Sequence, residues 1–250
     1  MSRAIFGKPA AGKRLEQINQ SANFKNGQFQ NLNFTPDLSE DATYARVIYD
    51  FLFSKHPRRI PTDTIPSVKT DLNQLSKEED VLIWFGHSSY FIQVDGKTFL
   101  VDPVFSGNAS PIKGSTKAFK GADIYKPNDV PDIDFLIITH DHYDHLDYKT
   151  VLQLQPKIKQ VICGLGVASH LEYWGYDAGS IHEKDWWMSI PLGEGFTIHT
   201  TPGRHFSGRS LKRNRSLRMS YVLETPTMKI FIGGDSGYDT HFAEIGDHYG

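Results

Sequence analysis

Three histidines and three aspartates fall within the ten residues ITHDHYDHLD, at positions 138–147. They follow a continuous apolar run, IDFLII, which is typical of a strand buried on both faces. Side chains two apart in an extended segment point the same way, so His140 and His142 can converge on one ion. Asp144 and His145 come slightly later and can reach a second ion nearby. The pattern H-x-H-x-D-H therefore predicts a metal site, and a polar loop merely rich in histidine is the alternative.

Two further candidate ligands follow other predicted strands. His205 comes after FTIHTTP, and Asp235 ends KIFIGGD, where a glycine pair allows the backbone to approach closely. Taken alone, they would be a surface histidine and a turn residue. Together with the first cluster, we predict that both are ligands, and an aspartate in the position of Asp235 can bridge two ions. Imidazole and carboxylate groups suit Zn²⁺, Mn²⁺ or Fe²⁺, and the absence of thiolate argues against a structural zinc site.

The elements that would position these residues can be predicted from periodicity. VLIWFG, SYFIQV and KTFLVDPVF indicate strands, with the Asp95-Gly96 pair as a hairpin turn between the last two. KQVICG, FTIHTTP, LRMSYVLET and KIFIGGD indicate further strands, whereas DYKTVLQLQP and VASHLEYWGY indicate helices. Such alternation predicts a layered α/β sandwich. We predict a domain over residues 81–250, preceded by an arm over residues 1–80 that packs on it and contains a helix near 41–53.

Composition excludes several other classes of protein. The 250 residues are 39% hydrophobic with a formal net charge of -2, which gives no general attraction to nucleic acid, so no nucleic-acid partner is expected. The single cysteine, Cys163, lies in an apolar run and is expected to be a buried structural thiol. There is no apolar stretch of signal-peptide or transmembrane length, so a cytoplasmic location without a transmembrane segment is expected. The oligomeric state is not predicted.

The ordered motifs resemble those of the metallo-β-lactamase superfamily. Within it, WFGHSSYFI, VDPVFSGNASP, THDHYDHLDY, RHFSGR and GGDSGY are similar to the branch of N-acyl-phosphatidylethanolamine phospholipase D, and more distantly to L-ascorbate-6-phosphate lactonases. The resemblance implies an αββα sandwich with two divalent metal ions between the sheets, zinc in the first place, with manganese or iron as alternatives. It also implies that a metal-bound hydroxide is the nucleophile.

The resemblance also implies a role for each motif residue. The first ion would be held by three histidines, His140, His142 and His205. The second would be held by Asp144 and His145, with Asp235 bridging both, and Asp144 and Asp235 would be the catalytic carboxylates. Asp102, in LVDP, would orient the ligand loop through hydrogen bonds. The superfamily has one more histidine ligand, in a strand beyond the bridging aspartate. The chain ends fifteen residues after Asp235, so by this comparison the sandwich lacks its C-terminal strands and helix, and neither His241 nor His248 is expected to replace that ligand.

The segment from Thr201 to Arg218 suggests the class of substrate. It contains six basic residues and no acidic one, which favours an anionic small molecule or lipid, although a solvated basic loop is the alternative. Arg209 is predicted to bind substrate, and His87 to line the cavity, unless it is a buried, hydrogen-bonded histidine. We therefore expect a metal-dependent hydrolase, a phosphodiesterase resembling phospholipase D. A sugar-phosphate lactonase and a non-catalytic metal-binding module are the alternatives.

Overall fold

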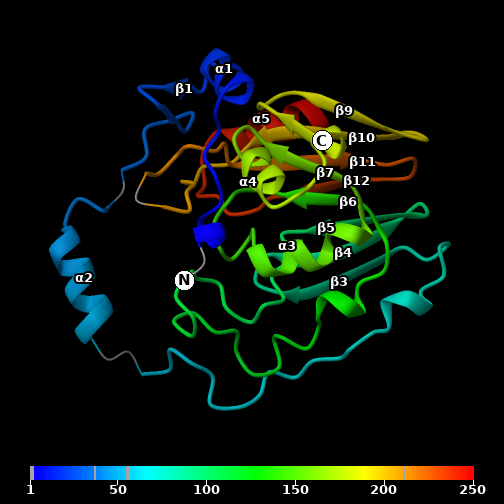
Figure 1. Ribbon diagram of the computed structural model, residues 1–250, viewed down its shortest axis with the longest axis horizontal. Coiled ribbons are helices and arrows are strands. Elements are labelled where there is room, and N and C mark those ends of the chain that lie inside the picture. Colours follow the sequence, from blue (N-terminus) through cyan, green and yellow to red (C-terminus); the bar gives the residue numbers. More distant parts are fainter. Residues whose placement is uncertain (1–2, 37, 55–56, 211) are drawn as a thin grey trace.

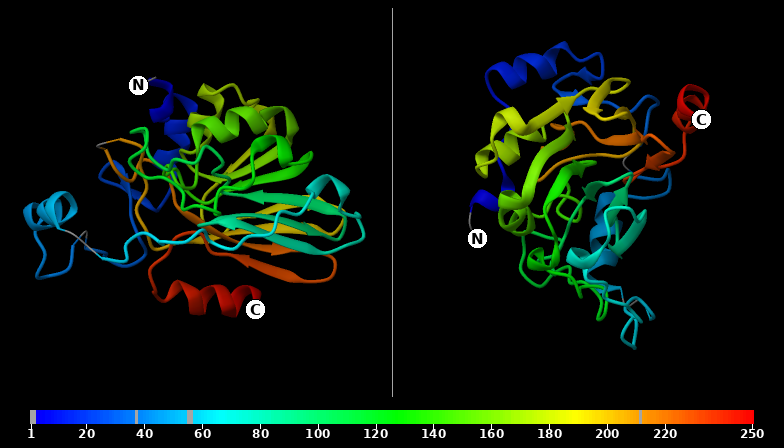
Figure 2. Two further views of the ribbon diagram at one scale, coloured as in Figure 1. Left: turned by 90° about the horizontal axis from the view of Figure 1, so that it is seen from below. Right: turned by 90° about the vertical axis from the view of Figure 1, so that its right-hand side faces the viewer.

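Two β-sheets pack face to face and carry helices on their outer faces (Figures 1 and 2). The computed structural model describes residues 3–36, 38–54, 57–210 and 212–250. This arrangement confirms the αββα sandwich predicted from the motifs. Among the described residues, no helix combines the length and the apolar character needed to cross a bilayer.

The first sheet has six strands in chain order. Its first three strands are antiparallel and the last four run parallel to one another. The predicted Asp95-Gly96 turn is confirmed, since both residues have the positive φ angles, 47° and 79°, that a tight hairpin turn requires. The strands are β3 (Val81–Gly86), β4 (Ser89–Val94), β5 (Lys97–Val101), β6 (Ile133–Ile138), β7 (Ile158–Gly164) and β8 (Ile181–Lys184).

The second sheet has four antiparallel strands in the order β12-β11-β10-β9. They are β9 (Ser189–Gly193), β10 (Phe196–Pro202), β11 (Met219–Glu224) and β12 (Lys229–Ile232), and a small separate hairpin is formed by β1 (Phe24–Lys25) and β2 (Gln28–Phe29). Strands β8 and β9 are absent from the sequence prediction, because IHEK and SIPLG are short and lack clear alternation of apolar residues.

Helices flank both sheets. Helices α3 and α4 cover the outer face of the first sheet, and α5 lies against the second (Figure 2). The helices are α1 (Lys13–Gln20), α2 (Tyr44–Phe53), α3 (Tyr148–Leu154), α4 (Ala168–Tyr173) and α5 (His241–Tyr249), with 3₁₀ turns at Arg3–Phe6, Leu72–Gln74, Pro127–Asp129, Gln155–Lys157 and Ala178–Ser180.

Strand β6 is buried on both faces, as its continuous apolar sequence predicts. Phe135 and Ile137 face the second sheet, where they join an apolar cluster that includes Leu223. Leu136 and Ile138 point the other way, into a cluster that includes residues of α3 and α4. Because successive strand side chains alternate between faces, the strand is fixed in register from both sides. The ligand-rich segment that follows it therefore starts from a rigid element.

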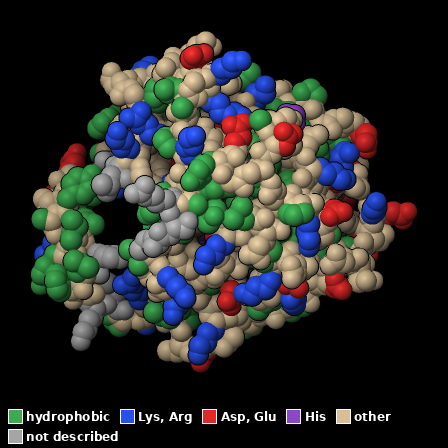
Figure 3. Space-filling model, in the orientation of Figure 1, with side chains coloured by type: hydrophobic (Ala, Val, Ile, Leu, Met, Phe, Trp, Pro, Cys, Tyr) green, Lys and Arg blue, Asp and Glu red, His purple; other side chains and the backbone are tan. Residues whose placement is uncertain are grey.

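One part of the N-terminal segment packs on the domain, whereas helix α2 does not. Ile18 and Phe29 are fully buried in the cluster between the sheets, and the Arg14 guanidinium pairs with two carboxylates of the domain. Helix α2 forms within the predicted stretch, but it stands apart from the body, and Ile48 and Leu52 are 57% and 62% exposed (Figures 1 and 3). The division into an arm over 1–80 and a domain over 81–250 remains a prediction.

Candidate metal centre

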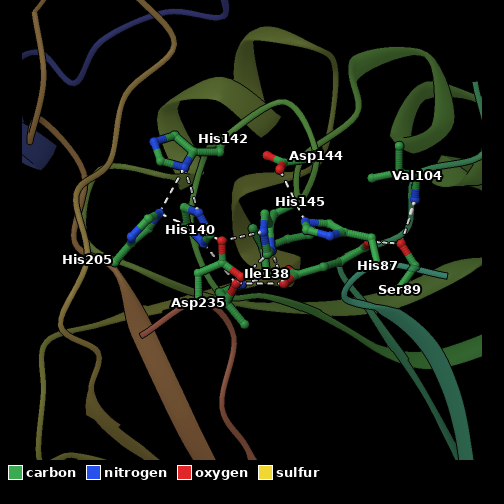
Figure 4. Close-up of polar contacts among 12 residues, drawn as sticks. His87, Ser89, Val104, Ile138, His140, His142, Asp144, His145, His205 and Asp235 are labelled. Atoms are coloured by element: carbon green, nitrogen blue, oxygen red, sulfur yellow. Dashed lines mark hydrogen bonds and ion pairs between the residues drawn. The ribbon is translucent and has the colours of Figure 1, made fainter. Parts of the chain in front are cut away.

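The candidate ligands gather at one edge of the sandwich, where strands from both sheets end (Figure 4). The segment after β6 supplies four of them, the loop after β10 supplies His205, and the loop after β12 supplies Asp235. All six sequence-predicted ligands lie within this cluster: His140, His142, Asp144, His145, His205 and Asp235.

Three histidines form the first group. Nε2 of His140 lies 2.9 Å from Nδ1 of His142, and Nε2 of His205 lies 3.3 Å from the same atom. Nitrogen ligands held about 2.0–2.1 Å from a tetrahedral zinc ion are themselves roughly 3.3 Å apart. Burial lowers the pKa of His205 to about 4, and burial with the neighbouring imidazoles lowers the pKa of His140 well below its usual range. Both rings are therefore neutral at pH 7, as metal ligands must be.

Asp235 lies between these three histidines and a second group, which includes Asp144 and His145. Its Oδ2 is 3.4 Å from Nε2 of His145 and 3.8 Å from Nε2 of His205. Asp144 lies beside His145, and its ligand oxygen is within 4.8 Å of the nearest ring nitrogens of the second group. Burial opposes ionisation of Asp144, but a hydrogen bond from His87 and the charge of His145 lower its pKa to about 2. Asp235, with His145 on one side and His205 on the other, has the position that a bridge between two ions requires.

Asp102 holds the ligand segment from behind. It is fully buried, its Oδ1 accepts a hydrogen bond from the Thr139 backbone N–H at 2.8 Å, and its Oδ2 accepts one from the Thr139 hydroxyl at 2.6 Å. The same Oδ2 lies 2.8 Å from Nδ1 of His145. Although burial opposes it, the Asp102 charge and hydrogen bond raise the pKa of His145 to about 10, so a cation that binds Nε2 would have to displace a proton from that nitrogen. The contact keeps a proton on Nδ1, so Nε2 faces the centre of the cluster.

His145 also provides a test of whether divalent ions fit here. Its Nε2 is buried and makes no hydrogen bond, although nearly every buried polar atom has a partner. This orphan nitrogen is directed toward Asp235, in a group of imidazole and carboxylate ligands. A divalent cation is the partner that such a set accepts. The residues therefore fit the implied ions.

Gly234 allows the loop after β12 to approach β6. Its φ is 58°, and a Cβ atom at this position would lie 2.8 Å from Cβ of Thr139. Glycine alone permits both the backbone angle and the contact. The close approach predicted from the glycine pair is present, and it brings Asp235 beside His145.

Comparison with known proteins identifies the family. The family model described as "Beta-lactamase superfamily domain" matches residues 97–250. The chain belongs to the metallo-β-lactamase superfamily. An uncharacterised protein of Mycobacterium tuberculosis is 35% identical over 99% of this chain and 68% of its own length. The N-acyl-phosphatidylethanolamine-hydrolyzing phospholipase D 1 of Caenorhabditis elegans is 28% identical over 77% of this chain and 57% of its own length.

A solved structure is also similar. The crystal structure of CmlA, a diiron beta-hydroxylase from Streptomyces venezuelae, superposes with a TM-score of 0.50 at 27% identity. The match covers 69% of this chain and 33% of that chain. This chain thus spans 68%, 57% and 33% of the lengths of these three proteins.

Arg209 is almost entirely buried, which does not suit the substrate-binding role predicted for it. It is only 4% exposed, and its Nη1 donates to the carbonyl oxygens of Asp141 and Leu146 at 2.9 and 2.6 Å. Its Nη2 donates to the Ile5 carbonyl at 2.8 Å. Arg209 therefore anchors the ligand segment and the N-terminal turn, which corrects the role predicted from the basic run. Counting charges along a sequence does not reveal which guanidinium groups point inward.

Asp141 positions the ligand-bearing segments, a role that the sequence reasoning missed. Although it lies between two ligands, its carboxylate points away from them and accepts a hydrogen bond from the Gly208 backbone N–H at 2.6 Å. Its Oδ2 lies 3.3 Å from Nε2 of His170. It thereby ties the segment after β6 to the loop that carries His205. The alternation within H-x-H, which places Asp141 on the opposite side, was the signal that could have found it.

The other basic residues of the run surround a cavity of about 1030 Å³ that adjoins His205. Lys212, Arg213 and Arg215 are exposed there, and the Arg213 guanidinium lies 4.7 Å from the ring centroid of Phe206. Arg218 also lines the cavity, but it is 1% exposed and donates to backbone carbonyls. The exposed positive side chains of the run are thus beside the first group of histidines.

The two histidines of α5 do not join the cluster among the described residues. Nε2 of His241 lies 3.0 Å from the Ser236 hydroxyl, and His248 contacts the Trp187 ring. His87, by contrast, lies 3.1 Å from Asp144 at the edge of the second group.

Proposed function

We propose that the chain is a metal-dependent hydrolase that acts on a phosphodiester. The observation that carries this proposal is the pair of ligand groups that share one carboxylate, Asp235. Two divalent ions bound there would act as Lewis acids on a phosphoryl oxygen and would lower the pKa of a water molecule to about 7. The proposed ligands of the first ion are His140, His142 and His205, and those of the second are Asp144 and His145, with Asp235 common to both.

The side chains of the cluster would contribute in distinct ways. Neutral His140 and His205 offer nitrogen lone pairs without losing a proton. Asp102 keeps the proton of His145 on Nδ1, which leaves Nε2 as the ligand atom. The carboxylates of Asp144 and Asp235 are 40% and 34% exposed, so each keeps oxygen lone pairs open to an entering substrate or water. They are the proposed catalytic carboxylates, because they would hold the ions and orient a water molecule for attack.

The cavity beside His205 supports an anionic substrate. Lys212, Arg213 and Arg215 supply positive charge at its wall, while Phe206 and Phe34 supply apolar surface. A phosphodiester with apolar substituents would be complementary to both. Two curated relatives are named as phospholipases D that hydrolyse N-acyl-phosphatidylethanolamine, which supports a lipid phosphodiester.

Zinc is the proposed metal, with manganese and iron as alternatives. The histidine and carboxylate ligands accept all three ions. The similar hydroxylase is described as a diiron protein, so iron needs a direct comparison. Purified protein would be stripped with a chelator and reloaded separately with each metal, and the ions per chain would be counted by elemental analysis.

The function is tested with each loaded form on three substrates. They are bis(p-nitrophenyl) phosphate, vesicles containing N-acyl-phosphatidylethanolamine, and a phosphorylated sugar lactone. We expect hydrolysis of the two phosphodiesters and its loss in Asp235→Asn. The matched control is Asp247→Asn, because Asp247 is exposed on α5 and outside the ligand groups.

Each other outcome has a distinct meaning. Opening of the lactone with both phosphodiesters inert would favour the lactonase alternative. Two bound ions with no turnover of any substrate would favour a non-catalytic metal-binding module. Phosphodiester hydrolysis that survives Asp235→Asn would contradict the proposed role of the shared carboxylate.

A further inference from the structure

His87 occupies an unusual backbone position in the turn between β3 and β4. Its φ is 50°, in the left-handed region, where glycine is the usual residue of a two-residue hairpin loop. Glycine ends β3 at position 86, yet the first residue of the turn itself is a histidine. A non-glycine residue held in this region costs about 1–3 kcal/mol, and such residues cluster at functional sites.

The His87 side chain points into the metal centre (Figure 4). Its Nε2 lies 3.1 Å from Oδ2 of Asp144, and its ring centroid is 5.1 Å from that of His145. One ligand atom from each of these three residues lies within 4.8 Å of the other two. Oxygen and nitrogen ligands about 2.0–2.2 Å from one zinc ion are roughly 3.1–3.5 Å apart, which the contact between His87 and Asp144 matches.

The turn is fixed on both sides of His87. The Trp84 indole N–H donates to the His87 carbonyl oxygen at 2.8 Å. Two residues after His87, the Ser89 hydroxyl donates to the Asp102 carbonyl oxygen at 2.5 Å and accepts from the Val104 backbone N–H at 3.2 Å. The same Asp102 orients His145 through its carboxylate. His87 and His145 are therefore held by one hydrogen-bonded unit, which is the arrangement that two ligands of one ion need.

We propose that His87 is a ligand of the second metal ion, beside Asp144, His145 and Asp235. This assignment rests on the proposed function, because it presupposes that ions occupy the cluster. Asp235 is shared with the first group, so among the described residues the second group without His87 has Asp144 and His145 to itself. An imidazole from the β3–β4 turn raises the number of protein ligands to four, which is the usual coordination number of zinc.

The experiment measures metal binding rather than activity. His87→Gly and His87→Asn both suit a positive φ, so neither should disturb the turn. His182→Asn is the matched control, since His182 lies on β8, the opposite edge strand of the same sheet, and its Nε2 lies 3.0 Å from the side-chain oxygen of Gln160. Zinc binding is followed by equilibrium dialysis with elemental analysis, and cobalt-loaded protein is followed by its visible absorption, which depends on the number and type of ligands. Circular dichroism checks that each variant is folded.

We expect two ions in the wild type and in His182→Asn. In both His87 variants the second ion should bind at least about tenfold more weakly, with a changed cobalt spectrum. Millimolar imidazole should restore the second ion to His87→Gly, because the missing side chain leaves room for it.

The proposal and the underlying function fail in different ways. If both His87 variants bind two ions with wild-type affinity and an unchanged cobalt spectrum, His87 only pairs with Asp144, and the assignment is wrong. If the wild type binds no ion at all, the proposed metal-dependent function is wrong as well.

Discussion

Replacing Asp102 by asparagine tests whether the buried carboxylate sets the protonation of a ligand. The two side chains have the same shape, and asparagine tolerates the 42° φ of this residue. The carboxylate accepts three hydrogen bonds, two from Thr139 and one from Nδ1 of His145. An asparagine can accept on one side only. If its NH₂ group faces His145, the imidazole must accept at Nδ1 and carry its proton on Nε2, where it would block a metal ion.

The opposite orientation of the amide is also unfavourable. The NH₂ group would then face the Thr139 backbone N–H. Two buried donors would point at each other without an acceptor, which lowers the stability of the native state by about 1–3 kcal/mol. Residues that support a ligand in this way typically contribute a factor of 10–100 to metal affinity. We therefore expect the second ion to bind Asp102→Asn 10- to 100-fold more weakly, or roughly 1.4–2.7 kcal/mol.

The dissociation constant is measured by competition with a chelator of known affinity. Asp95→Asn is the control, because Asp95 also has a positive φ, 47°, and its side chain accepts hydrogen bonds from Thr225 and Thr227 far from the cluster. This control should change stability slightly and metal affinity not at all. A folded Asp102→Asn variant that binds both ions like the wild type would refute the reasoning about the proton on His145.

Three other predictions concern the scaffold around the centre. In urea unfolding, Gly234→Ala should destabilise the fold by about 1–3 kcal/mol more than Gly193→Ala. Both glycines have a positive φ, but of the two only Gly234 faces a side chain, that of Thr139. Equal losses of stability would argue against the close approach. Arg209→Lys should lower the free energy of unfolding by about 1–3 kcal/mol, since a single ammonium nitrogen cannot span the Asp141 and Leu146 carbonyls on one side and the Ile5 carbonyl on the other, as the two guanidinium nitrogens do. A change below about 0.5 kcal/mol would contradict the anchoring role. Burial raises the pKa of the Cys163 thiol well above its usual range, so a thiol reagent at pH 8 should modify unfolded but not native protein, and rapid modification of native protein would contradict its burial.

The sequence was sufficient to predict the parts of the centre that depend on local pattern. The apolar run of β6 and the spacing H-x-H-x-D-H place His140 and His142 on one side of an extended segment, whatever the rest of the fold does. His205 and Asp235 follow strands in the same way. The three strands that precede these ligands, β6, β10 and β12, were each recognisable from their own sequence. The ends of packed strands then converge at one edge of a sandwich.

The remainder depends on packing between distant segments, which no local pattern contains. Arg209 belongs to a basic run, yet its guanidinium turns inward because three backbone carbonyls need a donor there. Helix α2 has the predicted helical spacing, yet its apolar side chains remain exposed. The contact between His87 and Asp144 joins residues that are 57 positions apart (144 - 87) and is visible only in three dimensions.

The centre draws ligands from both sheets, so metal removal should weaken the fold as well as the activity. His140 to His145 extend from the first sheet, whereas His205 and Asp235 extend from the second. Ions bound among them would connect the sheets at an edge where the chain offers imidazole and carboxylate groups rather than apolar contacts. A ligand present at 100 times its dissociation constant stabilises the native state by about 2.7 kcal/mol, which corresponds to roughly 5–11 °C in Tm for a chain of this size. Scanning calorimetry of chelated and zinc-loaded protein should show this difference, and Asp235→Asn should reduce it. An unchanged Tm on chelation would mean that the ions do not couple the two sheets.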